Sequence, residues 1–125
     1  MNRPTRSKRT ANARARGPRA RTRLSKERLA EMIEEATVDA YDESEQATGW
    51  YTMFEQHLEL PFETKVLGVA VTVADIDLRG SGQIVALCTR GRDRQAISLV
   101  DLPLPSPKPA GGDWIEAYRC WIAQR

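Results

Sequence analysis

The chain has 125 residues, of which 41% are hydrophobic and 29% charged, and its formal net charge is +2. This length favours a single domain, and the chain has no apolar stretch of the ~18 residues that a membrane-spanning helix needs. Residues 1–24 contain nine basic and no acidic residues, whereas residues 25–125 contain ten basic and seventeen acidic residues, a net charge of −7. The small total therefore excludes a uniformly basic nucleic-acid-binding protein. It conceals a cationic arm attached to an anionic body.

The arm has almost no apolar residues to bury, and its like charges repel one another, so we expect residues 1–24 to be disordered. The arm has no apolar segment of the kind found in secretory signals. Two cysteines, Cys88 and Cys120, are too few for a disulfide framework. We therefore expect a cytoplasmic, monomeric protein with reduced thiols, a single acidic domain over residues 25–125, and no membrane partner.

Two helices are predicted in the first half of the body. Ser25 is a suitable N-cap, and from there apolar residues recur at helical spacing as far as Ala47. Gly49 is expected to end or kink this helix. A second helix is predicted over residues 50–60, because Pro61 disfavours helical geometry at the residue before it.

The pattern then changes to alternation. Residues 65–76, rich in Val and Thr, predict a first strand, and residues 83–89 and 94–102 predict two more. The short turns between these segments favour an antiparallel meander. Prolines over residues 103–109 indicate an extended linker, and Asp113 is expected to cap a terminal helix. The sequence thus predicts an α+β fold: two N-terminal helices, a small antiparallel three-stranded sheet and a short C-terminal helix.

Residues suited to catalysis are scarce. One histidine, His57, and two distant cysteines cannot supply the three or four ligands of a zinc site. No nucleophile motif, phosphate-binding loop or dinucleotide fingerprint is present. We expect His57 to be a surface or half-buried residue and both cysteines to be packing residues. No enzymatic activity is predicted.

Carboxylates are abundant instead. Seven acidic residues and no basic residue lie between Glu31 and Glu45. On one continuous helix, Glu31/Glu35, Glu35/Asp39 and Asp39/Glu43 would be like-charged pairs four residues apart, each costing roughly a few tenths of a kcal/mol. Calcium, which prefers six to eight oxygen ligands, would relieve this repulsion. The alternative interpretation is a solvated acidic helix face.

A second group of acids lies in the segment Asp-Ile-Asp-Leu-Arg-Gly at residues 75–80. It matches the first, third and sixth positions of an EF-hand loop, but Arg79 at the fifth position and Ala86 at the twelfth do not fit. An EF-hand is therefore excluded. Asp75 and Asp77 remain candidate oxygen donors, with a plain hairpin as the alternative.

Several short motifs together resemble the CcbP-type bacterial calcium-binding proteins. They are DAYDESEQ at residues 39–46, GWY at 49–51, LPF at 60–62 and the acidic-aromatic DWIEAY at 113–118, and the resemblance extends over about residues 30–122. It implies a small acidic α+β domain that binds Ca²⁺ through surface carboxylates outside an EF-hand, as a buffer or a sensor.

The resemblance also implies candidate ligands by position. Asp39, Glu43 and Glu45 match its acidic motif, and Asp42 is a further acid beside them. The sheet ligands cannot be mapped in this way, so Asp75 and Asp77 are candidates through their chemistry alone. The motif aromatics are expected to anchor the core. These are Tyr41, Trp50, Trp114 and Trp121.

The basic arm lies outside the resemblance and supports an alternative function. Its cations, between residues 3 and 23, suit weak, salt-dependent and sequence-independent contacts with nucleic-acid phosphates or another acidic partner. The arm could equally fold back on the acidic body or serve solubility or targeting.

Overall fold

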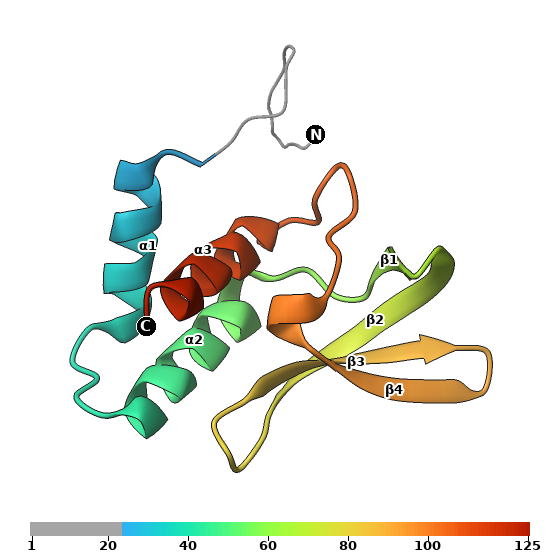
Figure 1. Ribbon diagram of the computed structural model, residues 1–125, viewed down its shortest axis with the longest axis horizontal. Coiled ribbons are helices and arrows are strands. Elements are labelled where there is room, and N and C mark those ends of the chain that lie inside the picture. Colours follow the sequence, from blue (N-terminus) through green and yellow to red (C-terminus); the bar gives the residue numbers. More distant parts are fainter. Residues whose placement is uncertain (1–23) are drawn as a thin grey trace.

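The computed structural model describes residues 24–125, so the predicted disordered arm lies almost wholly outside the described residues. Three helices gather on one side of the molecule, and a four-stranded antiparallel sheet of order β1-β2-β3-β4 extends from them (Figure 1). No helix within residues 24–125 has the length and apolar character needed to cross a bilayer. The elements are α1 Lys26–Thr37, α2 Glu43–His57, β1 Phe62–Val66, β2 Val69–Leu78, β3 Ile84–Arg90, β4 Asp93–Ser98, a 3-10 turn Leu99–Asp101 and α3 Gly112–Ala123.

The predicted first helix is interrupted. It begins as expected, with Ser25 as the N-cap of α1, but Val38 is extended at φ −59° and ψ 133° and Asp39 is left-handed at φ 59°. A new helix, α2, starts after Asp42. The predictions of one helix up to Gly49 and of a second helix starting at residue 50 were therefore wrong. The break separates acids that a continuous helix would have placed four residues apart.

Gly49 lies inside α2 and does not end it. A Cβ atom at this position would lie only 2.1 Å from the carbonyl oxygen of Ala36 in α1. Glycine is therefore required where α2 packs against the Ala36 carbonyl of α1.

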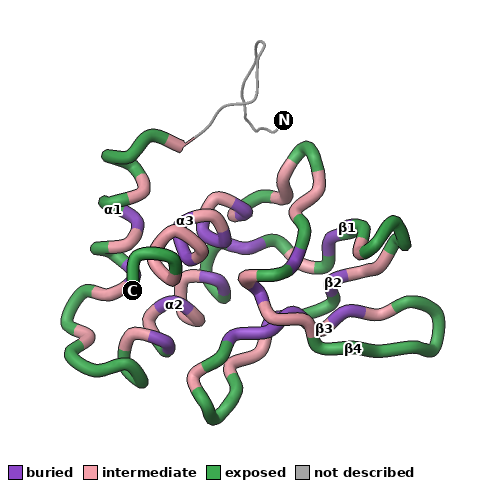
Figure 2. The backbone as a smooth tube through the Cα atoms, viewed as in Figure 1, coloured by how far each residue is buried: buried purple, intermediate pink, exposed green. Residues whose placement is uncertain are grey.

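An aromatic cluster forms the centre of the helical layer. Trp50 is fully buried, and its ring centroid lies 5.4 Å from that of Tyr118 and 5.7 Å from that of Trp121. Trp114 is also buried, so three of the four motif aromatics anchor the core as predicted. Tyr41 does not, because 85% of its surface is exposed in the α1–α2 connection. Buried positions concentrate where the helices meet the sheet (Figure 2).

The predicted α+β class is confirmed, but the count of three strands was wrong. The first predicted strand is a hairpin of β1 and β2, joined by Leu67 at φ 51° and Gly68 at φ 79°. Two residues with positive φ form the type of turn that suits a tight hairpin. Leucine is uncommon at positive φ, so the sequence did not indicate a turn at this position. Farther along, β4 ends at Ser98 and continues as the 3-10 turn, earlier than predicted.

The N-cap of the C-terminal helix lies two residues before the predicted cap, Asp113. Its N-cap is Gly111, where a Cβ atom would lie 2.1 Å from the carbonyl oxygen of His57. Asp113 instead accepts a 2.6 Å hydrogen bond from Lys108 Nζ, which also contacts Glu116. Burial alone lowers the pKa of Lys108, but these two hydrogen bonds outweigh it and leave the pKa raised. The linker is thereby fastened to the helix that follows it.

The histidine and the two cysteines, which were considered for catalysis and zinc binding, have the environments of ordinary structural residues. His57 is exposed and stacks on Trp114, with ring centroids 5.0 Å apart. Cys88 is buried in β3 and Cys120 is half-buried on α3, and both are free thiols. The expected packing role of Cys88 and the surface position of His57 are confirmed, whereas Cys120 is only half-buried and lies outside the core cluster.

Candidate metal centre

Four of the six predicted ligands lie in the α1–α2 connection and the first turn of α2. Asp39 is exposed in the connection, in a left-handed conformation that Asp tolerates better than most residues. Asp42 Oδ1 accepts a hydrogen bond from the backbone N–H of Glu45 at 2.8 Å, and Glu45 Oε1 accepts one from the backbone N–H of Tyr41 at 2.8 Å. Glu45 Oε1 also accepts from the N–H of Asp42, which completes a capping box. Two of the predicted ligands thus stabilise the start of α2.

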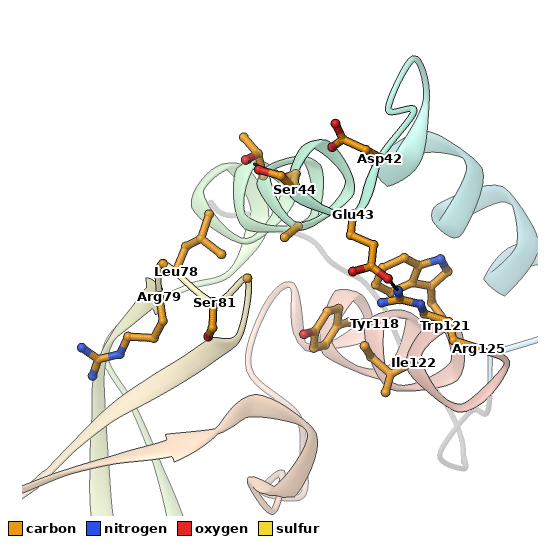
Figure 3. A pocket seen from close by; sticks show the side chains of 14 residues that line it. Asp42, Glu43, Ser44, Leu78, Arg79, Ser81, Tyr118, Trp121, Ile122 and Arg125 are labelled. Carbon is orange, nitrogen blue, oxygen red and sulfur yellow. Dashed lines mark hydrogen bonds and ion pairs between the residues drawn. The ribbon is translucent and has the colours of Figure 1, made fainter.

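Glu43 has a cationic partner from the other end of the chain. Its Oε2 lies 2.7 Å from a guanidinium nitrogen of Arg125, and the guanidinium carbon of Arg125 lies 4.6 Å from the centroid of Trp121. The close-up in Figure 3 shows this ion pair at the edge of an open cavity of about 810 Å³. The cavity lies between the first turn of α2, the β2–β3 turn and the end of α3. Arg125 therefore pairs with one of the carboxylates that the sequence predicts as a metal ligand.

The other two predicted ligands lie on β2, away from the α1–α2 connection. Asp75 and Asp77 pair with alternate residues of β3, just after an irregularity between Val73 and Asp75, so they share one face of the strand. Asp75 Oδ1 accepts from the backbone N–H of Ile76 at 2.9 Å, and Asp77 lies 3.5 Å from Arg79. Their position on a strand agrees with the exclusion of an EF-hand loop.

Glu55 on α2, which was not predicted as a ligand, acts on the same side chain as Asp75 and Asp77. Burial raises the pKa of the Tyr51 phenol, and the negative charges of Glu55, Asp75 and Asp77 raise it further. The carboxylates of Glu55 on α2 and of Asp75 and Asp77 on β2 therefore all lie close enough to Tyr51 for their charges to act on its phenol. The sequence shows that Tyr51 and Glu55 are four residues apart on one helix, but not which strand faces them.

The donor chemistry fits calcium, although the donors are not gathered into a ready-made cage. All seven candidate groups offer carboxylate oxygens, the hard donors that Ca²⁺ prefers, and most are exposed. Within residues 24–125, no three side chains of Asp, Glu, His or Cys converge closely enough to hold one metal ion. A bound ion would therefore draw carboxylates out of their present contacts and take further oxygens from water or the backbone. The seven are Asp39, Asp42, Glu43, Glu45, Glu55, Asp75 and Asp77.

Known proteins share this architecture. A structure described as a calcium binding protein in the calcium-binding form is 21% identical, with a TM-score of 0.60 over 77% of this chain and 90% of that one. The crystal structure of Anabaena CcbP is 23% identical, with a TM-score of 0.66 over 82% of this chain and 94% of that one. At these identities the two structures show the shared fold. No curated protein matches the chain significantly.

The family itself is established by a match along most of the sequence. The model of the CcbP family, described as calcium binding, matches residues 30–122. These are the limits over which the motifs resemble that family, and they include every candidate ligand. The resemblance is thus confirmed, and the chain belongs to the CcbP family of calcium-binding proteins.

Proposed function

We propose that this protein is a cytoplasmic calcium buffer or sensor that binds Ca²⁺ through surface carboxylates in two groups. The first group is the acidic connection, residues 39–45. The second is the α2–β2 group, formed by Glu55, Asp75 and Asp77. The family match over residues 30–122, which contains both groups, carries this proposal. The charge pattern supports it, because residues 31–45 contain seven acids and no basic residue.

The arrangement favours reversible, moderate binding. Carboxylates that hold a capping box or an ion pair must give up part of those contacts to bind a metal ion. A metal ion bound by exposed carboxylates also exchanges these ligands readily for water molecules. We therefore expect calcium to bind at micromolar or weaker concentrations, the range of reversible sensors and weak buffers.

Calorimetric titration of the full chain with calcium tests the function and separates the two groups. One variant, Asp39→Asn with Glu43→Gln, neutralises the acidic connection, and another, Asp75→Asn with Asp77→Asn, neutralises the α2–β2 group. Amides keep the size and much of the hydrogen bonding of the carboxylates while removing charge. Each variant should lose the heat of its own group, with affinity there falling tenfold or more.

The matched control removes two exposed acids from the opposite end of the sheet. Glu63→Gln with Asp93→Asn changes the net charge by the same amount but touches neither group. This control should bind calcium as the wild type does. Absence of heat from the wild type at millimolar calcium, or equal losses in all three variants, would contradict the proposal.

A further inference from the structure

The two outer hairpins carry their tips to the same end of the sheet, away from the helices (Figure 1). Thr72 of β2 and Thr89 of β3 form the last pair of their ladder toward that end, and beyond this pair the two hairpins diverge (Figure 1). We call residues 65–69 and 90–94 together the hairpin end. Both tips are exposed (Figure 2).

An apolar side chain protrudes at the apex of this end. Leu67 is 98% exposed and Val69 is 41% exposed. The other two large hydrophobic residues exposed to this degree within residues 24–125 are Val38 and Tyr41, in the α1–α2 connection. Leu67 also has a positive φ of 51°, a conformation that Asn, Asp and Gly adopt more easily. The fold therefore does not explain a leucine at this position, because the side chain is not buried and the backbone conformation favours other residue types.

Basic residues lie on both hairpins of this end, Lys65 beside Leu67 and three arginines on the other hairpin. Lys65, Arg90, Arg92 and Arg94 are all exposed, and none of them forms an ion pair within the described residues. In the β3–β4 strand register, Arg90 stands opposite Asp93 and Arg94 stands opposite Thr89. Successive positions of the register alternate between the two faces, so Arg90 and Arg94 lie on opposite faces of the ribbon. Asp93 shares the face of Arg90, so the hairpin end holds four basic residues and one acidic residue, a net charge of +3, although the body as a whole carries a net negative charge.

We propose that the hairpin end docks on a membrane surface rich in anionic phospholipid. A protruding apolar side chain needs a matching cavity in a protein partner, whereas the interfacial region of a bilayer accepts it without one. The guanidinium and ammonium groups of the two hairpins would pair with lipid phosphates at the same membrane surface. No helix of residues 24–125 could span a bilayer, and this contact requires none: it is peripheral and reversible. It also differs from the expectation of no membrane partner, which considered only apolar segments along the chain.

Co-sedimentation of the full chain with vesicles tests this inference. The vesicles contain phosphatidylglycerol and phosphatidylcholine in equal parts, and a calcium chelator keeps metal ions from bridging protein and lipid. Leu67→Asn should weaken vesicle affinity roughly tenfold, the effect of withdrawing one leucine side chain from an apolar environment. The variant should fold at least as well as the wild type, because Asn suits the positive φ.

A second variant and a matched control complete the design. Arg90→Gln with Arg92→Gln should lower affinity tenfold or more at low salt and reduce the salt dependence. Val38→Asn removes an exposed apolar residue from the α1–α2 connection, far from both hairpins, and should bind vesicles as the wild type does. The N-terminal arm is the same in every protein, so its own attraction to the vesicles cancels in each comparison.

Three outcomes would overturn the proposal. Leu67→Asn could bind vesicles as tightly as the wild type, which would mean that vesicle binding depends only on the charge of the protein. Val38→Asn could weaken binding as much as Leu67→Asn does. Finally, Leu67→Asn could abolish self-association measured by light scattering while vesicle binding persists, which would make the hairpin end an interface between copies of this chain.

Discussion

At the scale of single residues, the candidate ligands already have other partners. Asp42 and Glu45 bind backbone N–H groups at the start of α2, and Glu43 pairs with Arg125. These contacts offset part of the repulsion among the carboxylates of the acidic connection. They also mean that substitution by alanine would confuse loss of a helix cap, which costs about 1 kcal/mol, with loss of a ligand.

Arg125 allows a test of one ligand in isolation. Arg125→Gln frees Glu43 from its ion pair and should strengthen calcium binding at the acidic connection two- to fivefold. The small size follows because exposed ion pairs contribute about 0–1 kcal/mol. Calorimetry measures the affinity, and the emission of Trp121, which lies beneath the guanidinium, should change on calcium addition in the wild type more than in the variant. Unchanged affinity in Arg125→Gln would remove Glu43 from the ligand set.

At the scale of secondary-structure elements, local capping decides where the first helix ends. The apolar spacing of the sequence continues past Val38, and on that basis a single helix was predicted. The left-handed Asp39 and the capping box of Asp42 and Glu45 end one helix and start the next. The break also removes two of the like-charged pairs that a continuous helix would have held, so the chain relieves part of its repulsion by folding.

The crossing of α1 and α2 depends on Gly49. Alanine in the middle of a helix normally stabilises it relative to glycine by about 1 kcal/mol. At Gly49 the added methyl would meet the Ala36 carbonyl oxygen at 2.1 Å, so the helices would have to separate. We expect Gly49→Ala to lower the free energy of unfolding by about 1–3 kcal/mol.

Denaturant unfolding measures that change, with Gly80→Ala as its control. No atom lies within 4 Å of a Cβ built at Gly80, in the β2–β3 turn. The control should change stability by less than about 0.5 kcal/mol. A Gly49→Ala protein as stable as the wild type would show that the two helices can separate without cost.

At the scale of the whole molecule, stability should fall at alkaline pH. Burial raises the pKa of the Cys88 thiol, so above the ordinary thiol pKa the unfolded chain ionises first and the equilibrium moves toward unfolding. The pKa of Lys108 is also raised in the fold by its two carboxylate partners, so its stabilising contribution is complete at neutral pH and is lost as pH rises through that pKa. Both effects have the same sign.

The expected result is a melting temperature that declines steadily from about pH 8.5 upward. Cys88→Val should make the decline shallower between about pH 8.5 and 10, because it removes the thiol while keeping an apolar side chain in β3. Thermal unfolding followed by circular dichroism at a series of pH values provides the measurement. An identical decline in the wild type and Cys88→Val would exclude the thiol as a cause.

The properties that could be read from the sequence are those that neighbouring residues determine. Helical and alternating spacing predicted the α+β class, and the unequal charges of arm and body directed attention to cations. The acidic motif at residues 39–46 identified the family. Even the cap at Ser25 follows from residues within one turn of it, so no knowledge of distant contacts was needed.

Only the tertiary structure decided which distant residues meet. It set the charges of Glu55, Asp75 and Asp77 to act on Tyr51, gave Glu43 a cation from Arg125, and directed the tips of two hairpins to the same end of the sheet. Each of these depends on strand pairing or helix packing between segments far apart in the chain. Those contacts form because burying the shared core outweighs local preferences, and they leave no periodic trace in the sequence.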